Sequence, residues 1–155
     1  MTASSALVTI SDAGTTNIDA TDLSAIGGKT GGAVTVSNAV NIQGNTAQVT
    51  AALVTDDTKV LAANATVEIS NASTVAELNA LAPKAGVITG SIAATSLASL
   101  SGLATAGTDL ITITVNDNAG DNLNATDLSA LGGKTGGTVT VSNAVNIQGN
   151  TAQVT

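Results

Sequence analysis

Short stretches in which apolar and polar residues alternate recur along the chain, and they predict β-strands. The alternation is clearest at residues 67–69 and 111–115, where Val or Ile occupies every second position. This period is typical of a strand that has one face in a core and the other in solvent. The predicted strand cores are residues 8–10, 34–36, 67–69, 88–92, 111–115 and 139–141. Their first residues are 26, 33, 21, 23 and 28 positions apart.

Between several of these strands the apolar spacing changes to that of a helix. Leu78 and Leu81 follow Val75 at intervals of three, and the same spacing joins Leu97, Leu100 and Leu103. The predicted N-caps are Thr74 and Thr126-Asp127, and the paired glycines at 27–28 and 132–133 are predicted to stop helices. The pattern therefore predicts one strand and one short helix per turn of the chain.

Regular spacing of strands and helices predicts a solenoid rather than a globular domain. Strands joined by such crossovers lie parallel, and the strand-crossover-strand rule makes the path right-handed. We expect residues 1–155 to form a single right-handed parallel β-solenoid of α/β type. An all-β solenoid, in which the helix-like segments are turns and extra strands, is the alternative, because short apolar runs do not distinguish the two.

A longer repeat contains these shorter ones. Residues 17–50 return at 122–155, an offset of 105, and the two copies differ only at Ile18/Leu123, Asp19/Asn124, Ile26/Leu131 and Ala33/Thr138. The chain thus holds one 105-residue unit and a second, partial copy at 122–155. Such near-identity indicates recent duplication within a tandem array.

Composition narrows the classes of function. The chain has no aromatic residue, so Val, Ile, Leu and Ala must fill a thin core. Without Cys or His it has no disulfide, thiolate, imidazole base or usual zinc site, and we expect no enzymatic activity and no cofactor. A net charge of −7 with only four basic residues predicts no nucleic-acid binding, and no apolar run is long enough for membrane insertion.

Three phrases carry a resemblance to a known class of proteins. VTVSNAVNIQGNTAQVTAAL, VEISNASTVAELNALAPKAGVITGSIAATSLASL and TDLSALGGKTGG resemble repeats of giant repetitive cell-surface and secreted proteins of cyanobacteria and other Gram-negative bacteria. The resemblance implies an extracellular or cell-surface role, either structural, adhesive or associated with motility. The glycine-aspartate nonapeptide that binds calcium in such proteins is absent here, so calcium binding is not carried over.

Outward strand positions rich in Thr and Ser give one candidate binding surface. If the strands stack in register, these side chains align in flat ranks similar to those of ice-binding proteins, although Glu68 interrupts them and Thr is common on any exposed strand. The candidate surface residues are Thr9, Thr35, Thr89, Thr112, Thr114 and Thr140.

Asn and Asp residues that follow the strands give two further candidates. A ladder of turn side chains bonded to backbone is expected to stabilise the stack. Its members are Asp12, Asn38, Asn71, Asp117 and Asn143. The second candidate is a calcium site at Asp117, Asp121 and Asp127, where carboxylates lie among several Asn residues. A solvated turn is the competing interpretation.

The motif Gly27-Gly28-Lys29-Thr30, repeated at 132–135, resembles the end of a phosphate-binding loop. Leu23 and Leu128 stand where that loop needs its first glycine, so we interpret the motif as a tight corner.

The sequence therefore predicts a structural or adhesive tandem-repeat segment that acts as an elongated extracellular spacer. The alternative is a module that binds ice, mineral, polysaccharide or calcium. Its partners are expected to be neighbouring repeats of the same chain, with end-to-end self-association through exposed end coils.

Overall fold

The computed structural model describes residues 5–154 and has an α/β fold whose paired strands are parallel. The strands are β1 (Val8–Ile10), β2 (Asn17–Asp19), β3 (Val34–Val36), β4 (Asn41–Gly44), β5 (Val60–Leu61), β6 (Thr66–Ser73), β7 (Val87–Ile92), β8 (Leu110–Val115), β9 (Asn122–Asn124), β10 (Val139–Val141) and β11 (Asn146–Gln148). The helices are α1 (Ala20–Gly27), α2 (Thr46–Leu53), α3 (Val75–Leu81), α4 (Leu97–Leu100), α5 (Ala125–Gly132) and α6 (Thr151–Val154), with a 3₁₀ turn η1 (Ala82–Lys84) after α3.

All six predicted strand cores are confirmed, in β1, β3, β6, β7, β8 and β10. Five short strands were not predicted: β2, β4, β5, β9 and β11. Four of these place a single Ile or Leu between Asn, Asp or Gln residues, as in the sequences NID and NLN of β2 and β9. A single apolar residue creates no alternation, which is why the pattern did not reveal them.

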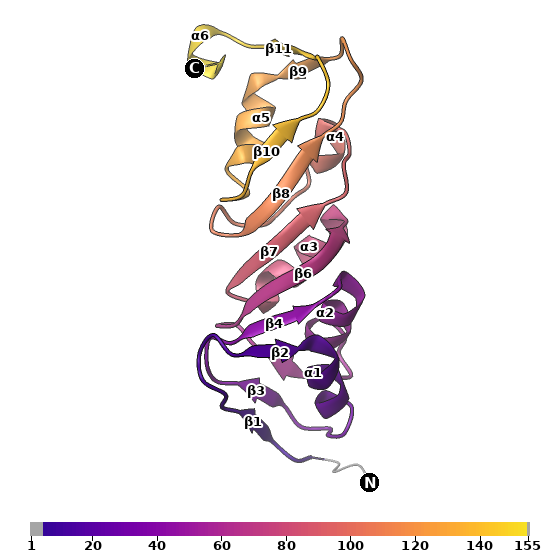
Figure 1. Ribbon diagram of the computed structural model, residues 1–155, viewed down its shortest axis with the longest axis vertical. Coiled ribbons are helices and arrows are strands. Elements are labelled where there is room, and N and C mark those ends of the chain that lie inside the picture. The colour runs from indigo at the N-terminus through magenta and orange to yellow at the C-terminus, as the bar shows by residue number, and fades with distance from the viewer. Residues whose placement is uncertain (1–4, 155) are drawn as a thin grey trace.

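Residues 5–154 form three parallel sheets, with strand orders β1-β3-β5, β2-β4-β6-β7-β8-β10 and β9-β11. Figure 1 shows these strands following one another along the long axis of the molecule. We call each pass of the chain, one or two strands followed by a helix, a layer. The layers are layer 1 (β1, β2, α1), layer 2 (β3, β4, α2), layer 3 (β5, β6, α3, η1), layer 4 (β7, α4), layer 5 (β8, β9, α5) and layer 6 (β10, β11, α6).

Each layer pairs with the next at a separation of 19 to 26 residues in sequence. Val8 pairs with Val34, and Val34 pairs with Val60 at the same separation. Ile42 pairs with Val67 at a separation that is one position shorter. The strands at Val34 and Val67, which follow each other among the predicted strand cores, are therefore not partners. Val34 pairs with Val60 of β5, and Val67 pairs with Ile42 of β4.

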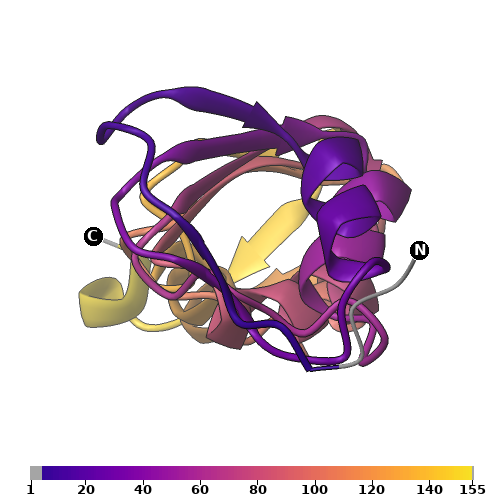
Figure 2. The same ribbon diagram turned by 90° about the horizontal axis from the view of Figure 1, so that it is seen from below.

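The prediction of one strand per turn holds only for layer 4. The other five layers have two strands before the helix, because the chain bends at turns that contain Asn or Gly and re-enters an extended conformation. Viewed along the long axis, successive strands and helices overlie one another around a common centre (Figure 2).

Helix ends follow local sequence signals. Thr74 caps α3 as predicted, and its side chain and that of Glu77 bond each other's backbone N–H groups. Asn45 and Gln48 form the same reciprocal capping box in α2. The predicted cap of α5 at Thr126-Asp127 is wrong, because β9 runs directly into the helix and Asn124 accepts from Thr126 N at 2.9 Å. Gly27 and Gly132 end α1 and α5 as predicted.

A single cluster of buried aliphatic residues runs from Ala20 in layer 1 to Leu131 in layer 5. It includes Ile42, Val67 and Ile88, which pair in three successive layers and are at most 1% exposed. Because each layer contributes only a few of these side chains, it buries its apolar surface mainly against its neighbours.

Candidate functional site

The outward threonines do not form the long ranks expected from the sequence. Thr9 pairs with Thr35, but the next residue in that row is Leu61, which is 58% exposed. Thr114 pairs with Thr140. The remaining members lie in mixed rows, because Thr89 stands between Glu68 and Leu110, and Thr112 pairs with Ser91. The threonines therefore lie at most two in a row, and leucine or glutamate occupies neighbouring positions, so the surface is irregular.

The second row of outward side chains carries a polar cluster centred on Glu68. The Glu68 carboxylate accepts from Gln43 Nε2 at 2.7 Å and from Asn41 Nδ2 at 3.2 Å. Asn41 Nδ2 also lies 3.1 Å from Asn17 Oδ1, so the cluster links layers 1, 2 and 3. The amide donors of Gln43 and Asn41 lower the pKa of the Glu68 carboxyl below its usual value.

This shift predicts a pH-dependent contribution of Glu68 to stability. Since the folded-state pKa is lower than that of the unfolded chain, the contribution is present above the unfolded pKa and is lost as the pH falls through the folded pKa. Replacing Glu68→Gln should lower Tm near neutral pH and lower it less at about pH 3, below the pKa of an ordinary Glu carboxyl. Thermal melts at the two pH values measure this. In a Gln43→Ala, Asn41→Ala background the substitution should have little effect at either pH, and an unchanged effect there would contradict the assignment.

The predicted Asn/Asp ladder residues lie at three places rather than in one column. Asn38 Nδ2 donates to the Asp12 carbonyl at 2.7 Å, and Asn143 Nδ2 donates to the Asp117 carbonyl at the same distance. These two bonds are equivalent in the two repeat copies, and each joins adjacent layers. Asn71 lies elsewhere, at the start of α2, where its Oδ1 accepts from Thr46 N at 2.7 Å.

The three calcium candidates do not converge. Asp117 Oδ2 accepts from Leu97 N at 2.8 Å, and Asp121 Oδ2 accepts from Asn118 N at 2.9 Å. Asp127 lies in the first turn of α5. Within residues 5–154 no group of three acidic side chains is arranged to hold a metal ion. The proposed calcium site is therefore wrong, because at least two of these carboxylates cap backbone N–H groups at separate places.

The corner motif contains a buried hydroxyl that the sequence pattern does not predict. Thr135 is 6% exposed, and its Oγ1 accepts from Ile111 N and Gly137 N, each at 2.9 Å, and lies 2.7 Å from Ile111 O. The first copy repeats the arrangement, with Thr30 bonded to Ala6 O and Gly32 N. Each GGKTGG corner lies just before the first strand of a layer. Its threonine is bonded to the backbone at the start of the preceding layer. This geometry supports the interpretation of the motif as a corner.

Asp109 is a second buried polar residue that was not predicted. It is 5% exposed, and its two carboxylate oxygens accept from Ile88 N and Ala106 N, each at 2.8 Å. The bond from Ala106 N closes the turn before β8. The bond from Ile88 N provides a partner for the backbone N–H of the first buried residue of β7. Nothing in the local sequence distinguishes this Asp from the exposed ones, because its burial depends on layer 4.

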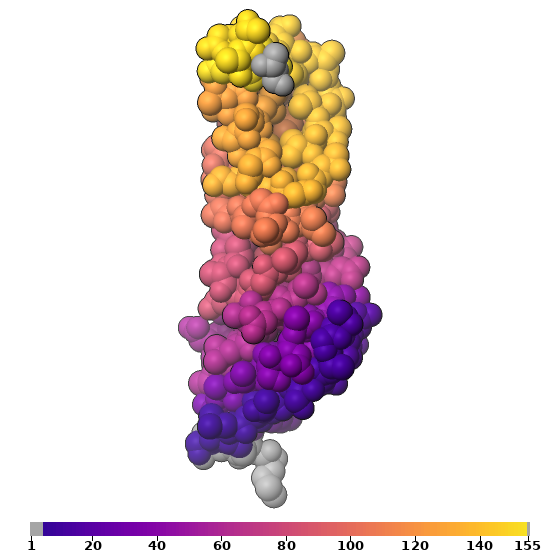
Figure 3. Space-filling view, turned by 90° about the vertical axis from the view of Figure 1, so that its left-hand side faces the viewer, coloured from indigo at the N-terminus to yellow at the C-terminus, as the bar shows by residue number. Residues whose placement is uncertain are grey.

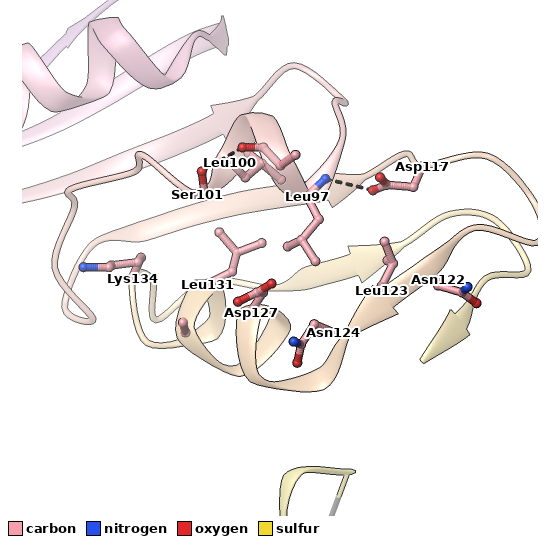
Figure 4. A pocket seen from close by; sticks show the side chains of 12 residues that line it. Leu97, Leu100, Ser101, Asp117, Asn122, Leu123, Asn124, Asp127, Leu131 and Lys134 are labelled. Atoms are coloured by element: carbon pink, nitrogen blue, oxygen red, sulfur yellow. Dashed lines mark hydrogen bonds between the residues drawn. The ribbon is translucent and has the colours of Figure 1, made fainter. Parts of the chain in front are cut away.

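A pocket of about 390 Å³ lies between layer 4 and layer 5. Figure 4 shows Leu97, Leu100, Leu123 and Leu131 around it, with Asp127 and Lys134 among its polar residues. It forms because layer 4 has no second strand and α4 has four residues where α5 has eight. The edge of β9 that faces away from β11 therefore has no strand partner.

Comparison with protein-family models, with curated proteins and with solved structures returned no match. No helix among the described residues is both long and apolar enough to cross a membrane.

Proposed function

We propose that this chain is a segment of a right-handed parallel α/β solenoid that serves as an elongated structural or adhesive spacer outside the cell or at its surface. The observation that carries the proposal is the strand pairing. Each inner layer pairs in parallel with the layers on either side, and the partners are separated by a similar length of chain each time, as in Val8, Val34 and Val60 or in Ile42, Val67 and Ile88.

In this proposal the chain acts through the length of the stacked layers and not through a chemical reaction. Adjacent layers bury aliphatic side chains against one another, so stability accumulates by nearest-neighbour contacts and length is added without a new core. Side-chain bonds between layers, from Thr135, Asn143 and Asp109, fix their register. The proposal assigns the chain no catalytic role.

The binding alternative receives less support from the surface. A flat array for ice or mineral needs long ranks of one side-chain type, whereas Thr9 and Thr35 are followed by Leu61. Two of the three carboxylates proposed for calcium, those of Asp117 and Asp121, are engaged with backbone N–H groups.

The test is to lengthen the chain by one 105-residue unit. Four layers at about 4.8 Å each should extend the molecule by about 19 Å, with no change in its cross-section. Small-angle X-ray scattering measures both quantities. A cross-sectional radius of gyration that grows with the added unit would show that the units collapse together, and the spacer proposal would then be wrong.

A further inference from the structure

One strand edge inside the stack, between layers 4 and 5, faces no other strand. These two layers lie between layer 3 and layer 6 (Figure 3). In layer 5, Asp121 O accepts from Asn146 N at 2.8 Å, so Asp121 and Leu123 direct their bonding groups toward β11. Alternate residues of a strand bond toward opposite edges. The N–H and C=O of Asn122 and the N–H of Asn124 therefore point toward layer 4.

Layer 4 gives these backbone groups no partner. Among residues 5–154, β9 pairs only with β11, and no backbone hydrogen bond joins layer 4 to Asn122 or Asn124. Elsewhere the second strand of one layer covers this edge in the next layer, as β2 covers β4 and β4 covers β6. Layer 4 has no second strand, so this edge of β9 remains open.

The open edge borders the pocket between layers 4 and 5, because Asn122 and Asn124 are among the residues that line it. Its volume of about 390 Å³ lies within the range of about 300 to 1,000 Å³ that is typical of ligand sites. Leucines of both layers surround the pocket and are at most 7% exposed: Leu97, Leu100, Leu123 and Leu131 (Figure 4). The pocket thus combines an apolar lining with unpaired backbone donors and an unpaired acceptor.

The charged groups at the pocket are of both signs. Asp117 already accepts from Leu97 N, which leaves the Asp127 carboxylate and the Lys134 ammonium for a ligand. A uniformly anionic ligand would be repelled by Asp127, and a uniformly cationic one by Lys134. A polypeptide complements this site, because its backbone supplies donors and acceptors in alternation and its side chains carry either charge.

We propose that the pocket between layers 4 and 5 is a docking site for an extended segment of a partner protein. The segment adds to β9 as a parallel strand and places one aliphatic side chain among the four leucines. Backbone bonds supply affinity in this mode of recognition, and the pocket selects the side chain. The inference rests on layers 4 and 5 alone and does not depend on the spacer role.

The pairing of β4 with β6 supplies the register. There Thr66 N donates to Val40 O, and Ile42 lies opposite Val67. Asn122 of β9 corresponds to Thr66, since each is the first residue of its strand and directs its N–H toward the preceding layer. The peptide residue in the place of Ile42 would therefore donate its N–H to the Asn122 carbonyl and direct its side chain into the pocket.

Fluorescence anisotropy with a labelled synthetic peptide tests the proposal. The probe has the sequence of residues 38–45, which contains β4 and is uncharged, and both its ends are blocked. It should bind the full chain with a Kd of about 0.1 mM. Ala98→Arg places a long side chain at the pocket and should raise this Kd at least about tenfold. Ala76→Arg, the matched control, changes the exposed second residue of α3 as Ala98→Arg changes that of α4, and should leave Kd unchanged.

Two outcomes of this measurement would overturn the proposal. The first is the absence of binding to the parent chain at concentrations up to about 1 mM. The second is an equal Kd in the Ala98→Arg and Ala76→Arg variants, which would place the peptide elsewhere on the molecule.

Changes in the peptide distinguish strand pairing from occupation of an apolar pocket. N-methylation at the position of Ile42 removes the N–H that is proposed to bond to the Asn122 carbonyl, and it should abolish binding. N-methylation at the position of Asn41, whose N–H faces away from β9 in this register, is the control and should leave binding intact. Equal binding of the two methylated peptides would show that the pocket takes an apolar group without a strand, and the proposal would be wrong.

Discussion

Replacing Asp109→Ala should be among the most destabilising single substitutions in the chain. The carboxylate is buried and accepts from Ile88 N in a buried bond and from Ala106 N in a partly buried one, so its removal leaves both N–H groups without their protein partner. A buried group that loses its partner costs about 1 to 3 kcal/mol, and we expect a loss of about 3 kcal/mol in the free energy of unfolding. Chemical denaturation followed by circular dichroism measures it.

Asp121 is a matched control in the same chain. It accepts from the N–H of the residue three positions earlier, Asn118, just as Asp109 accepts from Ala106. Asp121 is exposed and makes no bond equivalent to the one with Ile88. Asp121→Ala should therefore cost less than about 1 kcal/mol, since water solvates the freed N–H group. Equal losses in the two variants would show that the turn alone, and not the link to layer 4, accounts for the effect.

Replacing Gly27→Ala should destabilise the protein by about 3 kcal/mol, or lower Tm by roughly 9 °C. A Cβ at this position would lie 2.4 Å from Thr58 O and 2.8 Å from Thr58 Cα, which are backbone atoms of the corner between α2 and β5. Thr58 has little freedom to move, because its buried hydroxyl donates to Ala52 O at 2.8 Å. Relief of the clash requires α1 and this corner to separate. Differential scanning calorimetry measures the shift.

Gly132, the equivalent glycine of the second copy, should behave in the opposite way. No heavy atom outside its own helix lies within 4 Å of the Cβ that alanine would add there, and its backbone is helical. Gly132→Ala should leave Tm unchanged or raise it slightly, because alanine favours the helix by up to about 1 kcal/mol. The pair compares one motif in two surroundings. A large loss at Gly132 would show that the motif itself requires glycine, independently of the layers that cover it.

The sequence predicted the strands and helices that have a strong local pattern. Residues 111–115 alternate over a whole strand, and Val75, Leu78 and Leu81 place one face of α3 against the core, so local spacing determined the element in both cases. The parallel α/β arrangement followed from the order of these elements. Weak patterns predicted no strand, as in β4, where Ile42 is the only large apolar residue.

What the sequence could not predict depends on which layers are adjacent. Val60 was not recognised as the partner of Val34, since β5 has only two residues. Asp109 and Thr135 resemble exposed turn residues in sequence, and only the layer before them makes them buried and multiply bonded. The calcium prediction failed for the same reason, because nearness in sequence did not bring Asp117, Asp121 and Asp127 into one group that could hold a metal ion.

The missing second strand of layer 4 has a mechanical consequence. Layers 1 and 2 are joined through two strand pairs, whereas layers 4 and 5 are joined through β7 and β8 at three register positions and through an isolated bridge between Thr95 and Val115. The open edge of β9 and the pocket occupy the rest of that boundary. Under tension along the long axis, layers 4 and 5 would separate first. Every 105-residue unit would contain one such mechanically weak boundary.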